Sequence, residues 1–164
     1  MYGLIFFIIG CGVGHFEKKI GQEEFDHWRA LRIYMDEDTQ KEFRKFKTRE
    51  ERDQYLKDKG LWEKFYQYEP HIRDQIAGGD VKTGWSEDML FMAWGQPYDR
   101  EKIFGRNAQE SYRLTYRFEE LEDGAILVWE PKSKTQYKAV RLFQKEVYID
   151  DGKITEVKNI DQSF

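Results

Sequence analysis

Residues 72–99 divide the chain into two parts that differ in hydrophobic periodicity. Upstream of this segment apolar residues recur every three or four positions, as in amphipathic helices, and downstream they alternate with polar residues, as in strands. The segment itself contains a helix end, a glycine-marked turn, a short apolar helix for which Ser86 is the expected N-cap, and the Gly95-Gln96-Pro97 stop. We therefore expect a helical layer to turn into a sheet here, which predicts an α+β fold.

The composition limits both the size and the class of the protein. The 164 residues suffice for one domain with its own core plus appendages. Aromatic residues make up 16% of the chain, which argues against disorder although 35% of the residues are charged. The formal net charge of −4 argues against a nucleic-acid partner.

Helices are expected over most of the first half of the chain. Neither glycine nor proline interrupts Gln22–Phe46, and its apolar residues have helical spacing in two stripes, with a break at the acidic Asp36-Glu37-Asp38. Thr48-Arg49-Glu50-Glu51 predicts a capping box at the start of a second helix, in which the Thr48 hydroxyl and the Glu51 carboxylate bind free backbone N–H groups. Residues 61–68 and 70–77 predict two further short helices.

Strands are expected over most of the second half. Four segments predict them: residues 111–118, 125–129, 137–149 (one strand or two) and 153–160. Asp123-Gly124 and Asp151-Gly152 are turn signals between them. These features predict an antiparallel meander of three or four strands with the helices packed on one face.

The sequence holds no constellation typical of catalysis or metal binding. His15, His27 and His71 each lack a second histidine or cysteine at ligand spacing. The acidic run Asp36-Glu37-Asp38 lacks the glycine and the spacing of a calcium loop. There is also no nucleophile motif and no phosphate-cradling glycine loop. We expect a protein that is not an enzyme, with no metal, cofactor or small-molecule substrate.

The N-terminus contains the one apolar run. Met1–Gly10 is too short to span a bilayer, but its length suits the core of a signal peptide. Ile8-Ile9-Gly10-Cys11 resembles a bacterial lipobox, and Cys11 is the only cysteine, so it has no intramolecular disulfide partner. The resemblance implies a diacylglyceryl group on the Cys11 thiol, cleavage before this residue, and a membrane partner bound through the lipid.

This resemblance divides the N-terminal region into residues 1–10 as a lipoprotein signal peptide and residues 11–21 as a tether. Gly12 stands where an aspartate would favour inner-membrane retention in enterobacterial lipoproteins, which implies sorting to the outer membrane. The alternative for the apolar run is a buried N-terminal strand over Leu4–Ile9.

The central segment resembles the SmpA/OmlA (BamE-like) family of outer-membrane lipoproteins. The residues in register with the family pattern are Ile76, Gly79, Val81, Gly84, Trp85, Ser86, Met89, Ala93, Trp94, Gly95 and Pro97. Residues 112–116 resemble its aromatic strand, and residues 147–154, with Gly152, its closing hairpin. The resemblance covers roughly residues 72–157. Trp85 stands where the family has methionine. A fainter similarity, around Gly84-Trp85-Ser86, is to GWxTD-domain proteins.

The family resemblance implies a BamE/BLIP-like α+β layer over residues 70–164, preceded by a helical extension over residues 22–69 that short members lack. It implies a lipid-anchored, periplasm-facing protein of the outer membrane that acts as a non-catalytic protein-binding scaffold in outer-membrane assembly or integrity. The alternative function is a periplasmic inhibitor-like or envelope-machine-associated binding module on the same fold.

Overall fold

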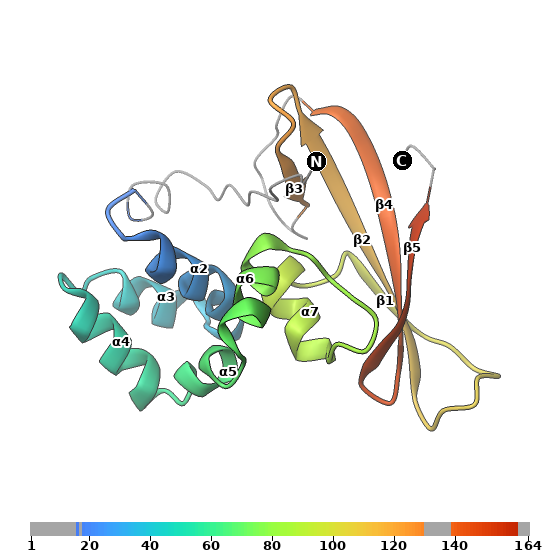
Figure 1. The fold of residues 1–164 in the computed structure, drawn as a ribbon, viewed down its shortest axis with the longest axis horizontal. Helices are drawn as coiled ribbons and strands as arrows, with labels where there is room; N and C mark the ends of the chain where they lie inside the picture. The colour runs from blue at the N-terminus through green and yellow to red at the C-terminus, as the bar shows by residue number, and fades with distance from the viewer. Residues whose placement is uncertain (1–15, 17, 130–138, 161–164) are drawn as a thin grey trace.

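The computed structural model describes residues 16, 18–129 and 139–160, and in this part of the chain a helical layer precedes one antiparallel sheet (Figure 1). The expected α+β class is confirmed. The helices are α2 (Gln22–Leu31), α3 (Glu37–Phe43), α4 (Arg49–Asp58), α5 (Trp62–Tyr66), α6 (Pro70–Gly78) and α7 (Glu87–Trp94), with a 3-10 turn, η1 (Arg32–Tyr34). None of these described helices is long and apolar enough to cross a membrane.

Local sequence signals explain where the helices begin and end. The expected capping box is present at the start of α4, where the Thr48 hydroxyl accepts from the Glu51 N–H and the Glu51 carboxylate accepts from the Thr48 N–H. The expected break in the helical pattern at Asp36-Glu37-Asp38 is present, because Asp36 caps α3 by accepting from the Thr39 N–H. Gly79 ends α6 in the left-handed conformation, with a φ of 70°.

The sheet in the described residues has five strands instead of the expected three or four. They are β1 (Asp99–Lys102), β2 (Ser111–Leu121), β3 (Ile126–Val128), β4 (Ala139–Asp150) and β5 (Lys153–Ile160). The order is β1-β2-β4-β5, and β3 also pairs with β2. The short strands β1 and β3 pair with different halves of β2, while β4 pairs with nearly its whole length. The long strand β2 is therefore the centre of the sheet.

One face of the sheet packs on the helical layer. Leu114, Tyr116 and Phe118 alternate along β2 and are fully buried, as the sequence pattern predicted. The Trp94 ring, at the end of α7, packs edge-on against Tyr116 and Phe118, with ring centroids 5.2 and 5.1 Å apart. Helix α7 is thus the element that joins the two layers.

The N-terminal helices share one core with the rest of the chain. Trp28 on α2 stacks on Phe43 of α3 at 4.8 Å between ring centroids, and the buried residues form a continuous cluster that extends to Ile154 in β5. Helix α2 also contacts α6 and α7. Phe16 and Ile20, which fall within the expected tether, pack against this core. The folded body therefore begins by Phe16.

Candidate functional site

Cys11, the expected lipidation residue, lies outside the described residues, as does the apolar run before it. The nearest described position is Phe16, whose ring packs edge-on against Trp28 and Phe43 with centroids 5.6 and 5.9 Å apart. Five peptide steps separate Cys11 from Phe16, and covalent geometry limits their span to about 18 Å. Any group carried on Cys11 therefore stays close to the Phe16 end of the helical layer.

The glycine-rich motif fastens the helical layer to the C-terminal hairpin. The Gly84 N–H donates to the Ile154 carbonyl at 2.7 Å, and the Ile154 N–H donates to the Trp85 carbonyl at 2.8 Å. The Glu87 N–H donates to the Gly152 carbonyl at 3.2 Å. Gly84 and Gly152 have φ angles of 86° and 77°, which glycine adopts without strain.

The remaining motif residues also have structural roles. The Trp94 indole donates to the Gly79 carbonyl at 2.9 Å, and the Tyr116 hydroxyl donates to the Gly95 carbonyl at 3.1 Å. The Ser86 hydroxyl caps α7 by accepting from the Met89 N–H at 3.3 Å. Trp85 is buried and Pro97 is half-buried. These residues make the joint between the two layers, and we assign no ligand to them.

His27 is a fully buried polar group in the helical layer. Its Nδ1 lies 2.8 Å from the Tyr66 hydroxyl, whereas its Nε2 lies 3.8 Å from Asp53 Oδ1, too far for a hydrogen bond. Burial away from water, followed by the positive charge of Arg49, lowers the pKa of His27 from 6.5 to about 4. Arg49 also neutralises Asp53, at 3.4 Å. His27 is therefore neutral at pH 7.

The other two histidines do not join His27. His71 is exposed on α6, and His15 lies outside the described residues. No group of three or more histidine, cysteine, aspartate or glutamate side chains in the described part of the chain is placed to hold a metal ion.

A buried ion pair joins α2 to α4. The Arg52 guanidinium donates to both carboxylate oxygens of Glu24 through Nε and Nη2, and through Nη1 to the Phe46 carbonyl at 2.9 Å. Both side chains are more than nine-tenths buried. Because each charge is matched by the other, the pair leaves no net charge at this position.

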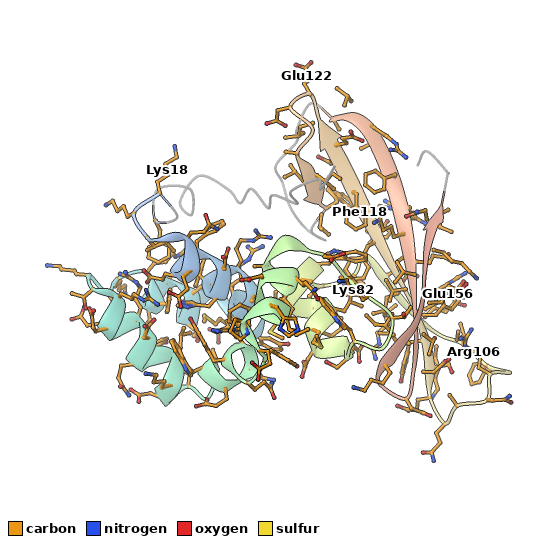
Figure 2. The ribbon with its side chains drawn as sticks, viewed as in Figure 1. Lys18, Lys82, Arg106, Phe118, Glu122 and Glu156 are labelled. Atoms are coloured by element: carbon orange, nitrogen blue, oxygen red, sulfur yellow. The ribbon has the colours of Figure 1, made fainter. Side chains whose placement is uncertain are left out.

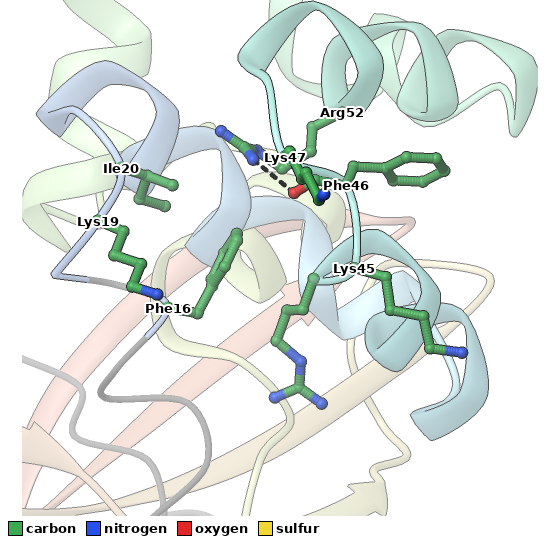
Figure 3. A pocket seen from close by; sticks show the side chains of 8 residues that line it. Phe16, Lys19, Ile20, Lys45, Phe46, Lys47 and Arg52 are labelled. Atoms are coloured by element: carbon green, nitrogen blue, oxygen red, sulfur yellow. Dashed lines mark hydrogen bonds between the residues drawn. The ribbon is translucent and has the colours of Figure 1, made fainter.

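A pocket of about 500 Å³ lies beside this pair, between the N-terminal turn and the α3–α4 connection (Figure 3). Phe16, Lys19 and Ile20 line it from one side. Arg44–Lys47 line it from the other, and Arg52 completes the lining. We call this cavity the basic pocket. Sequence reasoning missed it because its lining comes from three separate segments.

The basic pocket carries unneutralised positive charge. Apart from Arg52, its cations are Lys19, Arg44, Lys45 and Lys47, and none of the described residues that line the cavity carries a carboxylate. None of these four has an ion-pair partner among the described residues, and Arg44 uses only its Nε, which donates to the Gln40 carbonyl at 3.1 Å. Four cations that have no ion-pair partner among the described residues thus belong to the lining of one cavity, in a chain whose net charge is −4.

Cations on the sheet are mostly paired. Arg106 donates to both carboxylate oxygens of Asp150, and Arg113 bonds to Glu101. Lys158 lies 3.2 Å from Glu156 and over the Tyr148 ring. Figure 2 shows Arg106, in the β1–β2 connection, and Lys18, next in sequence to the pocket residue Lys19, on opposite sides of the molecule.

The comparisons with known proteins find no match: no protein-family model, curated protein or solved structure is significantly similar to this chain. The family resemblance of residues 72–157 therefore rests on the residue pattern alone.

Proposed function

We propose that this chain is a lipid-anchored protein of the bacterial cell envelope that acts as a non-catalytic protein-binding or scaffold module. The observation that carries the proposal is the sequence Ile8-Ile9-Gly10-Cys11 at the end of the one apolar run. Several acyl chains on one cysteine would hold the protein stably at a membrane. By the family resemblance, the membrane is the outer membrane and the body faces the periplasm, with a role in assembly or integrity.

An anchor at Cys11 would orient the folded body on the membrane. Since Phe16 packs into the helical layer within about 18 Å of Cys11, a lipid on Cys11 would keep that end of the helical layer at the bilayer surface. The β1–β2 connection lies at the other end of the molecule, where Figure 2 labels Arg106. The sheet would then project away from the membrane, toward proteins of the periplasm.

Exposed apolar side chains favour the sheet as the protein-binding part. The large apolar side chains that are exposed in the described residues all belong to the sheet or its connections: Tyr98, Phe104, Val140 and Leu142. Phe104, between β1 and β2, is 85% exposed. Aromatic side chains of this kind anchor protein interfaces more often than other residues do.

The anchor is tested by mass spectrometry of the membrane fraction. We expect an N-terminal peptide that begins with an acylated Cys11, and we expect Cys11→Ala to release the protein into the soluble fraction. A full-length chain with an unmodified cysteine would rule out the anchor. Continued membrane association of the Cys11→Ala variant would also count against it.

The partner is tested by pull-down from detergent-solubilised membranes with a tag at the C-terminus. Recovery of barrel-assembly components, reduced by Phe104→Ser, would support a role in outer-membrane assembly. Recovery of a periplasmic enzyme or another envelope machine would favour the alternative, an inhibitor-like or machine-associated module. Equal recovery with wild type and Phe104→Ser would exclude the sheet loop as the contact.

A further inference from the structure

The lining of the basic pocket combines two chemistries. Lys19, Arg44, Lys45 and Lys47 supply free positive charge, and Phe16, Ile20 and Phe46 supply apolar wall. A guanidinium and ammonium groups together are the donors that bind phosphate in proteins, because they match its charge and its acceptor oxygens. Inorganic phosphate has no apolar part that could pack against this wall. It suits a phosphate ester that continues into carbon.

The volume of the basic pocket is large enough for a small organic phosphate ester. Pockets for small organic ligands typically measure about 300–1,000 Å³, and the basic pocket measures about 500 Å³. Figure 3 shows the aromatic rings of Phe16 and Phe46, the Lys19 side chain, and the Arg52 guanidinium bound to the Phe46 carbonyl. Because Arg52 is held by Glu24 and this carbonyl, it supports the cavity, and the four free cations remain for a ligand.

The position of the pocket selects the source of the phosphate. Phe16, Lys19 and Ile20 follow Cys11 closely in the sequence, so a lipid on Cys11 would hold the pocket at the membrane surface. A group that is held there meets lipid headgroups at a high effective concentration. Lysine and arginine side chains near an anionic leaflet each add about 1 kcal/mol of attraction.

We propose that the basic pocket binds the phosphodiester of an anionic phospholipid headgroup, with phosphatidylglycerol as the simplest case. The inference rests on the proposed anchoring for its choice of a lipid over a soluble ester. Bound in this way, the headgroup would fix the rotation of the helical layer on the membrane, which an acyl chain alone leaves free.

Vesicle co-sedimentation of the full chain carrying Cys11→Ser tests the proposal without any acyl group. The probes are vesicles of pure phosphatidylcholine and vesicles of phosphatidylcholine mixed with phosphatidylglycerol. The apolar N-terminal run would bind both alike, so the measured quantity is the gain in affinity that phosphatidylglycerol brings. We expect a clear gain for the unsubstituted pocket, which weakens with added salt.

The decisive comparison is between two triple variants of equal charge. Lys19→Gln, Lys45→Gln and Lys47→Gln remove three exposed pocket lysines, while Lys82→Gln, Lys102→Gln and Lys153→Gln remove three exposed lysines elsewhere. Each pocket lysine is expected to contribute about fivefold in affinity for the anionic vesicles, so the gain should be about 100-fold smaller in the pocket variant. In the control variant the gain should be nearly unchanged. Equal losses would overturn the proposal, because diffuse charge would then explain the binding.

A soluble arm separates a lipid site from a free-phosphate site. Glycerophosphoglycerol, the deacylated phosphodiester headgroup of phosphatidylglycerol, should perturb the amide signals of Lys19 and Lys47 more strongly than inorganic phosphate does. If inorganic phosphate binds equally well, the pocket is a free-phosphate site and the lipid assignment is wrong. If Cys11 is acylated in cells but phosphatidylglycerol brings no gain, the pocket proposal fails and the anchor stands. If phosphatidylglycerol brings a gain in affinity but Cys11 is unmodified in cells, the anchor proposal fails and the pocket proposal stands.

Discussion

His27 makes the stability of the folded protein depend on pH in a window where few other groups titrate. Its ring is fully buried and Nε2 has no hydrogen-bond partner among the described residues. The titratable groups that face it come from its own helix and the two helices packed on it: Glu23 on α2, Arg49, Arg52 and Asp53 on α4, and Tyr66 on α5. The test variant is His27→Asn, whose amide cannot take up a proton.

The sign follows from the lowered pKa. In the unfolded chain the pKa of His27 is 6.5, and in the folded protein it is about 4. Between pH 6.5 and pH 4, His27 is protonated in the unfolded chain and neutral in the folded protein. The free energy of unfolding therefore falls as the pH falls. The full loss over 2.5 pH units is about 3 kcal/mol, of which about 2 kcal/mol falls between pH 7 and pH 5.

Urea unfolding followed by tryptophan fluorescence at about pH 7, 6 and 5 measures the effect. We expect wild type to lose about 2 kcal/mol more than His27→Asn between the two extremes, whatever the stability of the variant at pH 7. His71→Asn is the matched control, because His71 is exposed, and it should follow wild type.

Carboxylates with a lowered pKa, such as Asp36 and Asp150, also lose stabilising interactions in acid, at lower pH. Their contribution is common to all three proteins and cancels in the comparison. If wild type and His27→Asn lose stability in parallel, the imidazole is not buried in neutral form and the reasoning is refuted.

Three further substitutions test the packing and the proposed interface. Arg52→Leu leaves the Glu24 carboxylate buried without its partner and should lower the free energy of unfolding by about 3–5 kcal/mol, measured by chemical denaturation. The double variant with Glu24→Leu should recover most of this loss, and no recovery would refute the pairing. Ser86→Ala removes the cap on the Met89 N–H and should lower stability by about 1 kcal/mol, and an unchanged midpoint would show that the cap is idle. Phe104→Ser should change stability by less than about 0.5 kcal/mol, because the ring is 85% exposed, yet lower partner recovery in the pull-down; normal recovery would remove Phe104 from the interface.

Local signals in the sequence predicted much of the fold. The Thr48 capping box, the Ser86 cap and the alternation of β2 depend on neighbouring residues, and the structure confirms each of them. Strand β1 was missed because all four residues of Asp99–Lys102 are exposed, polar and charged, with no apolar alternation. Its strand conformation comes from backbone pairing with residues 112–115 of β2, which no local pattern reveals.

The candidate site was less predictable, for a related reason. The basic pocket needs the N-terminal turn, the α3–α4 connection and Arg52 to meet in space, and none of these segments is distinctive alone. The sequence shows Lys45 and Lys47 as ordinary surface lysines. Only the absence of carboxylates from the described lining of the cavity, together with the packing of Phe16, marks the cluster as a site.

The backbone hydrogen bonds between residues 84–87 and residues 152–154 also limit the order in which parts of the protein can fold. Gly84 and Gly152 are about 70 positions apart, so the loop between them must close before these bonds form. The helical layer can make its local contacts early, but its joint with the sheet must wait for the last hairpin.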